Sequence, residues 1–408
     1  MKIVIVTSSF PNNENSISGN FILDQINNIQ AFYKNIKFVV CAPGNSLTSI
    51  KKKSNIRFYN FRYFFPRKYE KIGIESITDL IKKNKIYYFV MFFYTISQFL
   101  KLIFIVSKEK PDLIYAHWFT PQAITSFLVS KLFNIPYKIT IHSSDLKILD
   151  YYLGRIGRNI SKIILKSSSG ITVTSKNIFK TVEIVLNKSE ISDLNILQHP
   201  MGIDSIGLDQ TNKDLEILKL LDPKSKYILY LGRLVEKKGL ESLINGFAEF
   251  SKNSDYKLII AGFGNLEAKM KKLVNKKKLH HKVIFTGKVG LPKKKALFEN
   301  SEMLIVPSDS ISGLPVSEGM PVTILEGLYF GKLVLASSQT NCEDVIENGI
   351  NGFVFEATGS ESIVEILDKV SRLDSKEKNT IRTNALKSSS LYDSKGSSKM
   401  YYEFLKND

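Results

Sequence analysis

Cysteine, tryptophan and histidine are scarce in this chain. Its 408 residues include 2 Cys, 1 Trp and 5 His. Cys41 and Cys342 lie far apart without a CxxC spacing, which argues against a zinc site and favours a reducing compartment. The first apolar run, at residues 3–7, is too short for a secretory signal peptide and predicts a buried strand.

Acidic residues are also few relative to basic ones. The chain has 57 Lys+Arg against 39 Asp+Glu, a net charge of +18. Residues 1–204 hold 27 of these basic and 13 of these acidic residues, a net +14, which leaves +4 for the remainder. This asymmetry indicates that the first half faces an anionic partner, such as membrane lipid, a lipid phosphate or nucleic acid. A solvated basic surface that reflects only a Lys-rich composition is the open alternative.

Apolar, β-branched runs alternate with helical segments along the whole chain. The runs lie at 3–7, 37–42, 113–116, 137–141 and 170–174, and again at 227–231, 257–261, 283–285, 303–306 and 333–336. This pattern is typical of parallel sheets covered on both faces, and the length suits two domains. We predict an α/β chain with two doubly wound, Rossmann-like domains, 1–204 and 205–385. A helical segment, 386–408, would return to the first domain.

Ligands of open α/β sheets bind beyond the carboxyl ends of the strands, and we expect a site in a cleft between the domains. The stretch 317–327 contains two carboxylates, Glu318 and Glu326. Pro321 suits the first position of a helix, and Met320 before it offers no capping side chain. The first amides would therefore be open to an anion. One carboxylate before this helix and one in its second turn suggest a ligand with both phosphate and hydroxyl groups, such as a nucleotide-sugar.

Basic and glycine-rich strand ends occur in the same half. Arg233 and Lys238 lie between the run 227–231 and a helical segment, where a guanidinium and an ammonium suit a diphosphate. Gly262 and Gly264 end another strand, but the full GxGxxG fingerprint is absent, so a tight structural turn is the alternative. Val289 follows the next strand, whose end suits backbone hydrogen bonds to a base.

The first half has polar strand ends of its own. Gly19 precedes a helix, where its backbone would approach a phosphate or simply permit the turn. His142 follows the run 137–141 together with two serines and Asp145, which favours a functional role. His117 and Trp118 end another strand and would shape an acceptor pocket or pack internally.

Two segments are candidates for membrane contact. Residues 51–71 interleave eight basic residues with seven aromatic ones, and residues 86–106 are apolar enough to raise a transmembrane interpretation. Gln98 and Lys101 near the middle of the second segment argue against spanning, since a charge at the bilayer centre costs at least roughly 2.5 kcal/mol. We interpret 86–106 as a helix packed on the first domain, either resting partly in the membrane interface or wholly buried.

Taken in order, these landmarks resemble the GT-B fold retaining glycosyltransferases of family 4, also called group 1, over almost the whole chain. Any one motif has modest specificity, but the ordered set is strong. The set comprises Gly19-Asn20-Phe21, the His142 motif, residues 199–204, residues 232–239, Gly262–Gly264, Glu318–Glu326, residues 341–349 and Asn351-Gly352-Phe353-Val354.

The resemblance implies a nucleotide-sugar donor in the second domain, an acceptor in the first, and transfer with retention. Carried over by position, Arg233 and Lys238 hold the diphosphate, Glu326 binds the ribose hydroxyls, Glu318 contacts the transferred sugar, and His142 faces that sugar. The implied donor-binding set is Gly19, Arg233, Lys238, Gly262, Gly264, Val289, Met320, Pro321, Val322, Thr323 and Glu326. The implied catalytic set is Glu318, His142, Arg233 and Lys238, and the acceptor set is His117, Trp118 and Asp145.

We therefore expect a cytoplasmic hexosyltransferase, peripheral on a membrane, that acts in surface polysaccharide assembly on a glycan or lipid-linked glycan. No DxD-type pair occupies a plausible donor position, so neither a metal ion nor another cofactor is expected besides the donor substrate. A nucleotide-sugar epimerase of the same form and a basic nucleic-acid-binding protein are the alternatives, although no nucleic-acid partner is expected. A dehydrogenase is disfavoured because no dinucleotide fingerprint follows the first strand.

Overall fold

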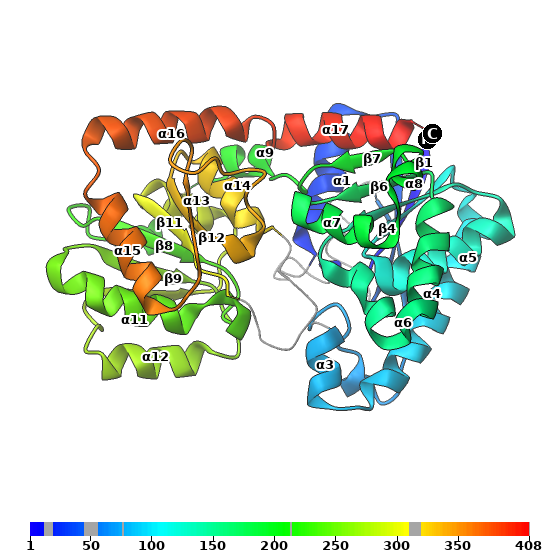
Figure 1. Cartoon of the computed structure of the whole chain (residues 1–408), viewed down its shortest axis with the longest axis horizontal. Coiled ribbons are helices and arrows are strands. Elements are labelled where there is room, and N and C mark those ends of the chain that lie inside the picture. The colour runs from blue at the N-terminus through cyan, green and yellow to red at the C-terminus, as the bar shows by residue number, and fades with distance from the viewer. Residues whose placement is uncertain (12–18, 45–55, 76, 213, 310–319, 408) are drawn as a thin grey trace. The chain divides into compact units, whose positions relative to one another are not determined.

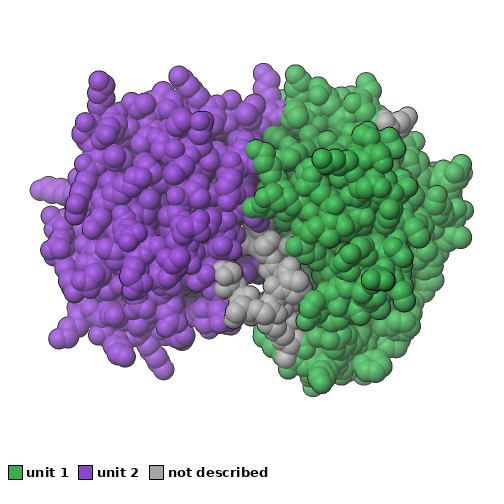
Figure 2. All heavy atoms as spheres, in the orientation of Figure 1, with its two compact units in different colours: residues 1–201, 397–408 green, residues 202–396 purple. Residues whose placement is uncertain are grey.

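The computed structural model describes residues 1–11, 19–44, 56–75, 77–212, 214–309 and 320–407. The chain forms two compact units, coloured separately in Figure 2. Unit 1 comprises Met1–Met201 with Ser397–Asp408, and unit 2 comprises Gly202–Gly396. Each unit contains one parallel sheet with helices on both faces, so the predicted two-domain α/β fold is confirmed (Figure 1).

The described part of unit 1 contains a seven-stranded parallel sheet in the order β3-β2-β1-β4-β5-β6-β7. The strand order reverses between β1 and β4, which is where such sheets bind ligands. Polar loops beyond these two strands and beyond β5 are therefore well placed to form a site. The strands are β1 (Lys2–Val6), β2 (Lys37–Pro43), β3 (Arg57–Phe61), β4 (Leu113–His117), β5 (Tyr137–Ile141), β6 (Gly170–Val173) and β7 (Ile196–Gln198).

The side chains of β1 point alternately to the two faces of this sheet and show how both faces are covered. Ile3 and Ile5 join the core under α1 (Asn20–Phe32) and α17 (Ser394–Lys406). Val4 and Val6 join the opposite core, which also contains Leu80 and to which four longer helices contribute. Those helices are α4 (Tyr87–Glu109), α5 (Ile124–Phe133), α6 (Lys147–Lys166) and α7 (Lys176–Val185); the short α3 (Ile77–Lys83) and α8 (Lys188–Ser192) complete the described helices of unit 1.

The described part of unit 2 contains a six-stranded parallel sheet in the order β10-β9-β8-β11-β12-β13. Here the order reverses between β8 and β11, so the loops after these strands hold the candidate site. The strands are β8 (Tyr227–Leu231), β9 (Lys257–Ala261), β10 (Val283–Gly287), β11 (Met303–Val306), β12 (Leu333–Ser337) and β13 (Phe353–Phe355). One face packs against α11 (Leu240–Phe250), α12 (Glu267–Lys276) and α15 (Ser360–Ser371); the other packs against α10 (Leu215–Leu218), α13 (Leu291–Glu299) and α14 (Val322–Tyr329). Helices α9 (Ser205–Gln210) and α16 (Ser375–Ser389) also belong to unit 2.

The structure differs from the sequence prediction in two respects. The short strands β3, β7 and β13 were not predicted; each lies at the edge of its sheet and is only partly buried. The predicted boundary at residue 386 is also earlier than the observed return to unit 1, which begins at Ser397. Helix α16 stays in unit 2 because it packs on α14, with Ala385 and Tyr392 buried in the unit 2 core.

Candidate active-site loops of the two units

In unit 2, the loop after β8 carries the two predicted cations. The Arg233 side chain is exposed and has no hydrogen-bond or ion-pair partner among the described residues. Lys238 is buried in the short turn before α11. Gly239 follows with φ +65°, and a Cβ there would overlap the carbonyl oxygen of Pro307 beyond β11. This close approach holds residues 232–239, here called the cation loop, against the end of β11, where the strand order of the sheet reverses.

The N-terminus of α14 lies beside this loop. Thr323 Oγ1 donates a hydrogen bond to the carbonyl oxygen of Leu231 at 3.4 Å. Pro321 is the N-cap with ψ 127°, so the helix begins at Val322, one residue later than predicted, and no described side chain caps it. Open amide groups at a helix start attract anions. The structure thus brings the Arg233 loop and an uncapped helix terminus to one place.

The second carboxylate of the predicted pair is paired with a lysine that the sequence did not single out. Glu326 is buried in the second turn of α14, and its Oε1 accepts a hydrogen bond from Lys294 Nζ of α13 at 2.6 Å. Burial raises the pKa of nearby Asp204, while Lys294 lowers that pKa and Glu326 raises it. These three residues therefore form one polar cluster. The first predicted carboxylate, Glu318, lies outside the described residues.

Four other predicted donor residues have evident packing roles. A Cβ at Gly262 would overlap the carbonyl oxygen of Gly232, and one at Gly264 would overlap that of Leu234. The two glycines therefore let the loop after β9 approach the cation loop. Met320 is buried in the unit 2 core, and Val289 packs against it, so their side chains serve the core. Donor contact by these four residues stays a prediction.

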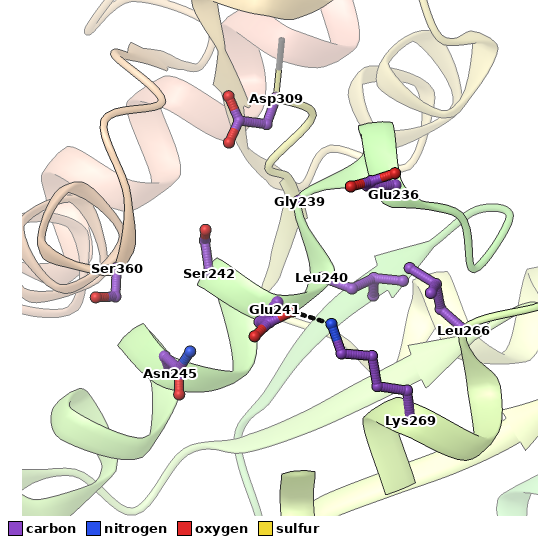
Figure 3. A pocket seen from close by; sticks show the side chains of 10 residues that line it. All are labelled: Glu236, Gly239, Leu240, Glu241, Ser242, Asn245, Leu266, Lys269, Asp309 and Ser360. Carbon is purple, nitrogen blue, oxygen red and sulfur yellow. Dashed lines mark hydrogen bonds and ion pairs between the residues drawn. The ribbon is translucent and has the colours of Figure 1, made fainter. Parts of the chain in front are cut away.

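A separate cavity of about 520 Å³ opens on the other side of the cation loop (Figure 3). Three of its lining residues are acidic, namely Glu236, Glu241 and Asp309. Its only lysine, Lys269, pairs with Glu241 at 2.6 Å. Neither Arg233 nor Lys238 lines this cavity. A diphosphate would meet like charge there, so we do not assign the donor to it.

In unit 1, the loops after β1, β4 and β5 meet around a cluster of aromatic rings. Gly19 is the N-cap of α1 with φ +79°, and a Cβ there would overlap the carbonyl oxygen of Ser9. The Phe21 ring contacts the Trp118 ring with centroids 5.9 Å apart and the His142 ring at 5.3 Å. The structure therefore gathers the predicted unit 1 residues from three separate loops.

His117 and His142 share a hydrogen bond. His117 Nδ1 and His142 Nε2 lie 3.0 Å apart. Burial lowers the pKa of His142 to about 3 and that of His117 well below its usual value, so both rings are neutral. His117 Nε2 is buried without a partner among the described residues. Because orphaned buried N–H donors are rarer than orphaned acceptors, we assign the proton to His117 Nδ1. His142 Nε2 is then an acceptor, and its Nδ1–H is left as a donor for a ligand oxygen.

The remaining predicted acceptor residues shape the same loops. Asp145 is buried, and its carboxylate accepts hydrogen bonds from the backbone N–H groups of Ser143, at 3.1 Å, and Phe119. Burial raises the pKa of Asp145 to about 6. Trp118 is half-buried with φ +74°, a backbone conformation that is rare for a bulky residue outside functional sites. Asp145 thus positions backbone and His117 positions the His142 ring, and acceptor contact by either stays a prediction. No cluster of three or more potential metal ligands occurs within the described residues.

Two doubly wound units with polar loops at the sheet switch points define a GT-B fold. A solved structure with this fold is Anabaena HepE in complex with UDP and glucose, which superimposes with a TM-score of 0.72 over 99% of each chain at 15% sequence identity. That likeness shows the fold.

The family follows from sequence comparison. Residues 213–388 match the family model of glycosyl transferases group 1. The uncharacterized glycosyltransferase MJ1178 of Methanocaldococcus jannaschii is 25% identical over 325 residues, 78% of this chain and 82% of that protein. A Campylobacter jejuni α-1,4-N-acetyl-D-galactosaminyltransferase, named for a diphosphate-undecaprenol-linked glycan, is 30% identical over 150 residues, 36% of this chain and 39% of that protein. The predicted resemblance to the group 1 glycosyltransferases is confirmed by the family match over residues 213–388 and by these relatives.

Proposed function

We propose that this glycosyltransferase moves a sugar from a nucleoside diphosphate sugar to a glycan or lipid-linked glycan during surface polysaccharide assembly. The observation that carries the proposal is that the uncapped N-terminus of α14 contacts the end of β8, two residues before the exposed Arg233. A guanidinium with no partner among the described residues, on a loop beside open amides, suits a diphosphate. The UDP bound in the HepE structure supports a nucleotide-sugar as the donor class.

In the proposed reaction the bond between the anomeric carbon and the diphosphate oxygen breaks. Negative charge then grows on the diphosphate, and Arg233, Lys238 and the amides of α14 stabilise that charge. Because these groups supply the positive charge, the proposal requires no metal ion. Glu326, in the second turn of the same helix, would hold the ribose hydroxyls.

We propose that transfer proceeds with retention. The acceptor hydroxyl would attack the anomeric carbon from the face that the diphosphate leaves, and its proton would pass to the departing phosphate oxygen. A new glycosidic C–O bond replaces the broken one. His142 fits this scheme as a hydrogen-bond donor to a sugar oxygen through Nδ1–H, not as a base, because its Nε2 is bound to His117.

Peripheral attachment to the cytoplasmic face of a membrane is part of the proposal. The Campylobacter relative is named for an undecaprenol-linked glycan. An acceptor of that kind would place the reaction at a bilayer surface.

The test is turnover with a panel of nucleotide-sugars, first as slow donor hydrolysis and then with glycan acceptors. Arg233→Ala should reduce turnover about 10²–10³-fold, as expected for the loss of one donor to a developing anion. Lys269→Ala is the matched control, since this exposed lysine pairs with the exposed Glu241 on α11 and its side chain lies in the separate acidic cavity. Wild-type turnover in the Arg233 variant would remove the diphosphate assignment.

Product analysis separates the transferase from the epimerase alternative. NMR of the product should show the donor's anomeric configuration at the new linkage. Release of nucleoside diphosphate with an epimerised free sugar, in the absence of any acceptor, would instead indicate an epimerase.

A further inference from the structure

An extended apolar surface covers the outer side of unit 1. Along α4, large side chains that are 40% to 67% exposed recur over seventeen residues, a length of about 24 Å from first to last at 1.5 Å per residue. This stripe consists of Tyr88, Phe89, Phe92, Phe93, Ile96, Leu100 and Phe104.

Helix α6 adds a second stripe. An ordinary surface helix turns its apolar residues inward, but most large apolar residues of α6 point outward and are 37% to 69% exposed. The buried side of α6 is formed by Gly157, Ser161, Ile164 and Leu165. The exposed apolar residues are Tyr151, Tyr152, Leu153, Ile156, Ile160 and Ile163.

The two stripes form one surface, here called the α4–α6 face. The ring of Tyr88 contacts the ring of Tyr152 edge-on, with centroids 6.1 Å apart. Both helices lie on the same side of unit 1 (Figure 1). A contiguous apolar surface of this extent exceeds the scattered exposed side chains of ordinary soluble proteins and marks an interaction site.

Helix α4 is held along the sheet by its other side. By length and composition it is apolar enough to cross a membrane. However, Gln98 is buried and its side chain accepts from Thr125 of α5 at 3.0 Å and donates to Tyr94 at 3.2 Å. At the end of α4, Glu109 accepts from Arg57 at 3.0 Å and from Tyr59 at 2.6 Å. These contacts leave only the outer half of α4 available to contact lipid. That arrangement suits a helix at a membrane interface and not a helix that spans the membrane.

The charge around the α4–α6 face identifies its occupant. Residues 147–166 contain five basic residues and one acidic residue, a net +4, of which Arg158 pairs with Asp150 while Lys162 and Lys166 pair with Glu190 of α8. On α6, the exposed Arg155 has no ion-pair partner among the described residues, and it neighbours the exposed Ile156. Basic residues also precede α4, with Lys83 and Lys85 both exposed. Tyrosine and phenylalanine beside lysine and arginine match the boundary between anionic headgroups and acyl chains.

We propose that the α4–α6 face docks the enzyme on an anionic bilayer, with α4 and α6 lying along the surface and their outer side chains among the headgroups. This inference rests on the peripheral attachment included in the proposed function and names the surface that makes it; its test requires no turnover.

Co-sedimentation of the full chain with vesicles tests the proposal. The wild type should bind phosphatidylcholine vesicles that contain phosphatidylglycerol, and added salt should weaken binding. The double variant Phe89→Ser/Ile156→Ser should bind at least about tenfold more weakly. Both side chains are more than 60% exposed, so folding should be unaffected. The matched control is Leu220→Ser/Leu391→Ser, which removes two side chains of 60% and 61% exposure from unit 2 and should bind like the wild type.

Arg155→Glu isolates the electrostatic contribution. It should weaken binding to vesicles with phosphatidylglycerol and leave any binding to pure phosphatidylcholine unchanged. Equal vesicle binding by the wild type and Phe89→Ser/Ile156→Ser would overturn the proposal. So would a wild type that ignores vesicles but dimerises through Phe89 and Ile156 in light scattering, because a second copy would then be the occupant. Turnover of a soluble acceptor should be the same in both double variants, which separates this result from any failure of the proposed reaction.

Discussion

Because His199 is buried, we predict that the stability of unit 1 depends on pH in a specific way. Its side chain is 6% exposed, and its Nε2 lies 3.1 Å from Ser397 Oγ in the returning segment. Burial lowers the pKa of His199 to about 4. An exposed histidine in the unfolded chain has a pKa near 6.5.

The direction of this pH dependence follows from the lowered pKa of His199. Between pH 6.5 and 4 the unfolded chain binds a proton at His199 that the folded unit does not. The stability present above pH 6.5 is therefore lost as the pH falls toward 4. At up to about 1.4 kcal/mol per pH unit, the lowered pKa of His199 alone reduces the free energy of unfolding by about 2 kcal/mol between pH 6.5 and 4.5. A typical domain has only about 5–15 kcal/mol in total, so this loss is measurable.

The assay is urea unfolding at pH 6.5 and at pH 4.5, comparing the wild type with His199→Gln. Trp118 is the only tryptophan and belongs to unit 1 with His199, so its fluorescence reports the correct unit. Asp145 acts in the opposite direction because burial raises its pKa to about 6, but both proteins contain Asp145 and its effect cancels. Between the two pH values, the free energy of unfolding of the wild type should fall by about 2 kcal/mol more than that of His199→Gln. An equal loss in the two proteins would refute the reasoning.

Three further substitutions test packing. Lys138 is 1% exposed and donates hydrogen bonds to two backbone carbonyls near the end of α17. Lys138→Met should therefore lower the free energy of unfolding by about 1–3 kcal/mol, measured by thermal unfolding, and should speed hydrogen exchange in α17. Lys294→Met leaves the Glu326 carboxylate without its cation and should lower the melting temperature; adding Glu326→Gln should restore much of it. Gly264→Ala should reduce the free energy of unfolding by about 1–3 kcal/mol through backbone overlap. Gly290→Ala, whose Cβ would meet only Pro292 Cδ at 3.9 Å, should cost less, through the N-cap of α13 alone; equal melting temperatures would contradict the packing argument.

Much of the fold was predictable because the central strands are short runs of β-branched residues buried on both faces. The runs at Tyr137–Ile141 and Tyr227–Leu231 match their strands residue for residue. The edge strand Arg57–Phe61 was missed because its charged and aromatic residues read as a surface segment. Its pairing with β2 becomes visible only in three dimensions.

The candidate site was predictable in part for a similar reason. Arg233 follows a strand and Thr323 lies at the start of a helix, and both kinds of position can be inferred from the local sequence pattern. Lys294 lies 32 residues before Glu326 in a lysine-rich helix, so nothing local distinguishes it from a solvated residue. The hydrogen bond between His117 and His142 likewise depends on β4 and β5 being neighbours.

The return of residues 397–408 to unit 1 has a consequence for how the protein is made. A nascent chain that has just emerged with unit 1 still lacks Tyr401 and Phe404, which are buried in that unit's core. A further 196 residues, from 201 to 397, must be translated first, which takes about 10–40 s at 5–20 residues per second. The unit that the ribosome begins first is therefore the one completed last, and its uncovered core needs protection while the intervening unit folds.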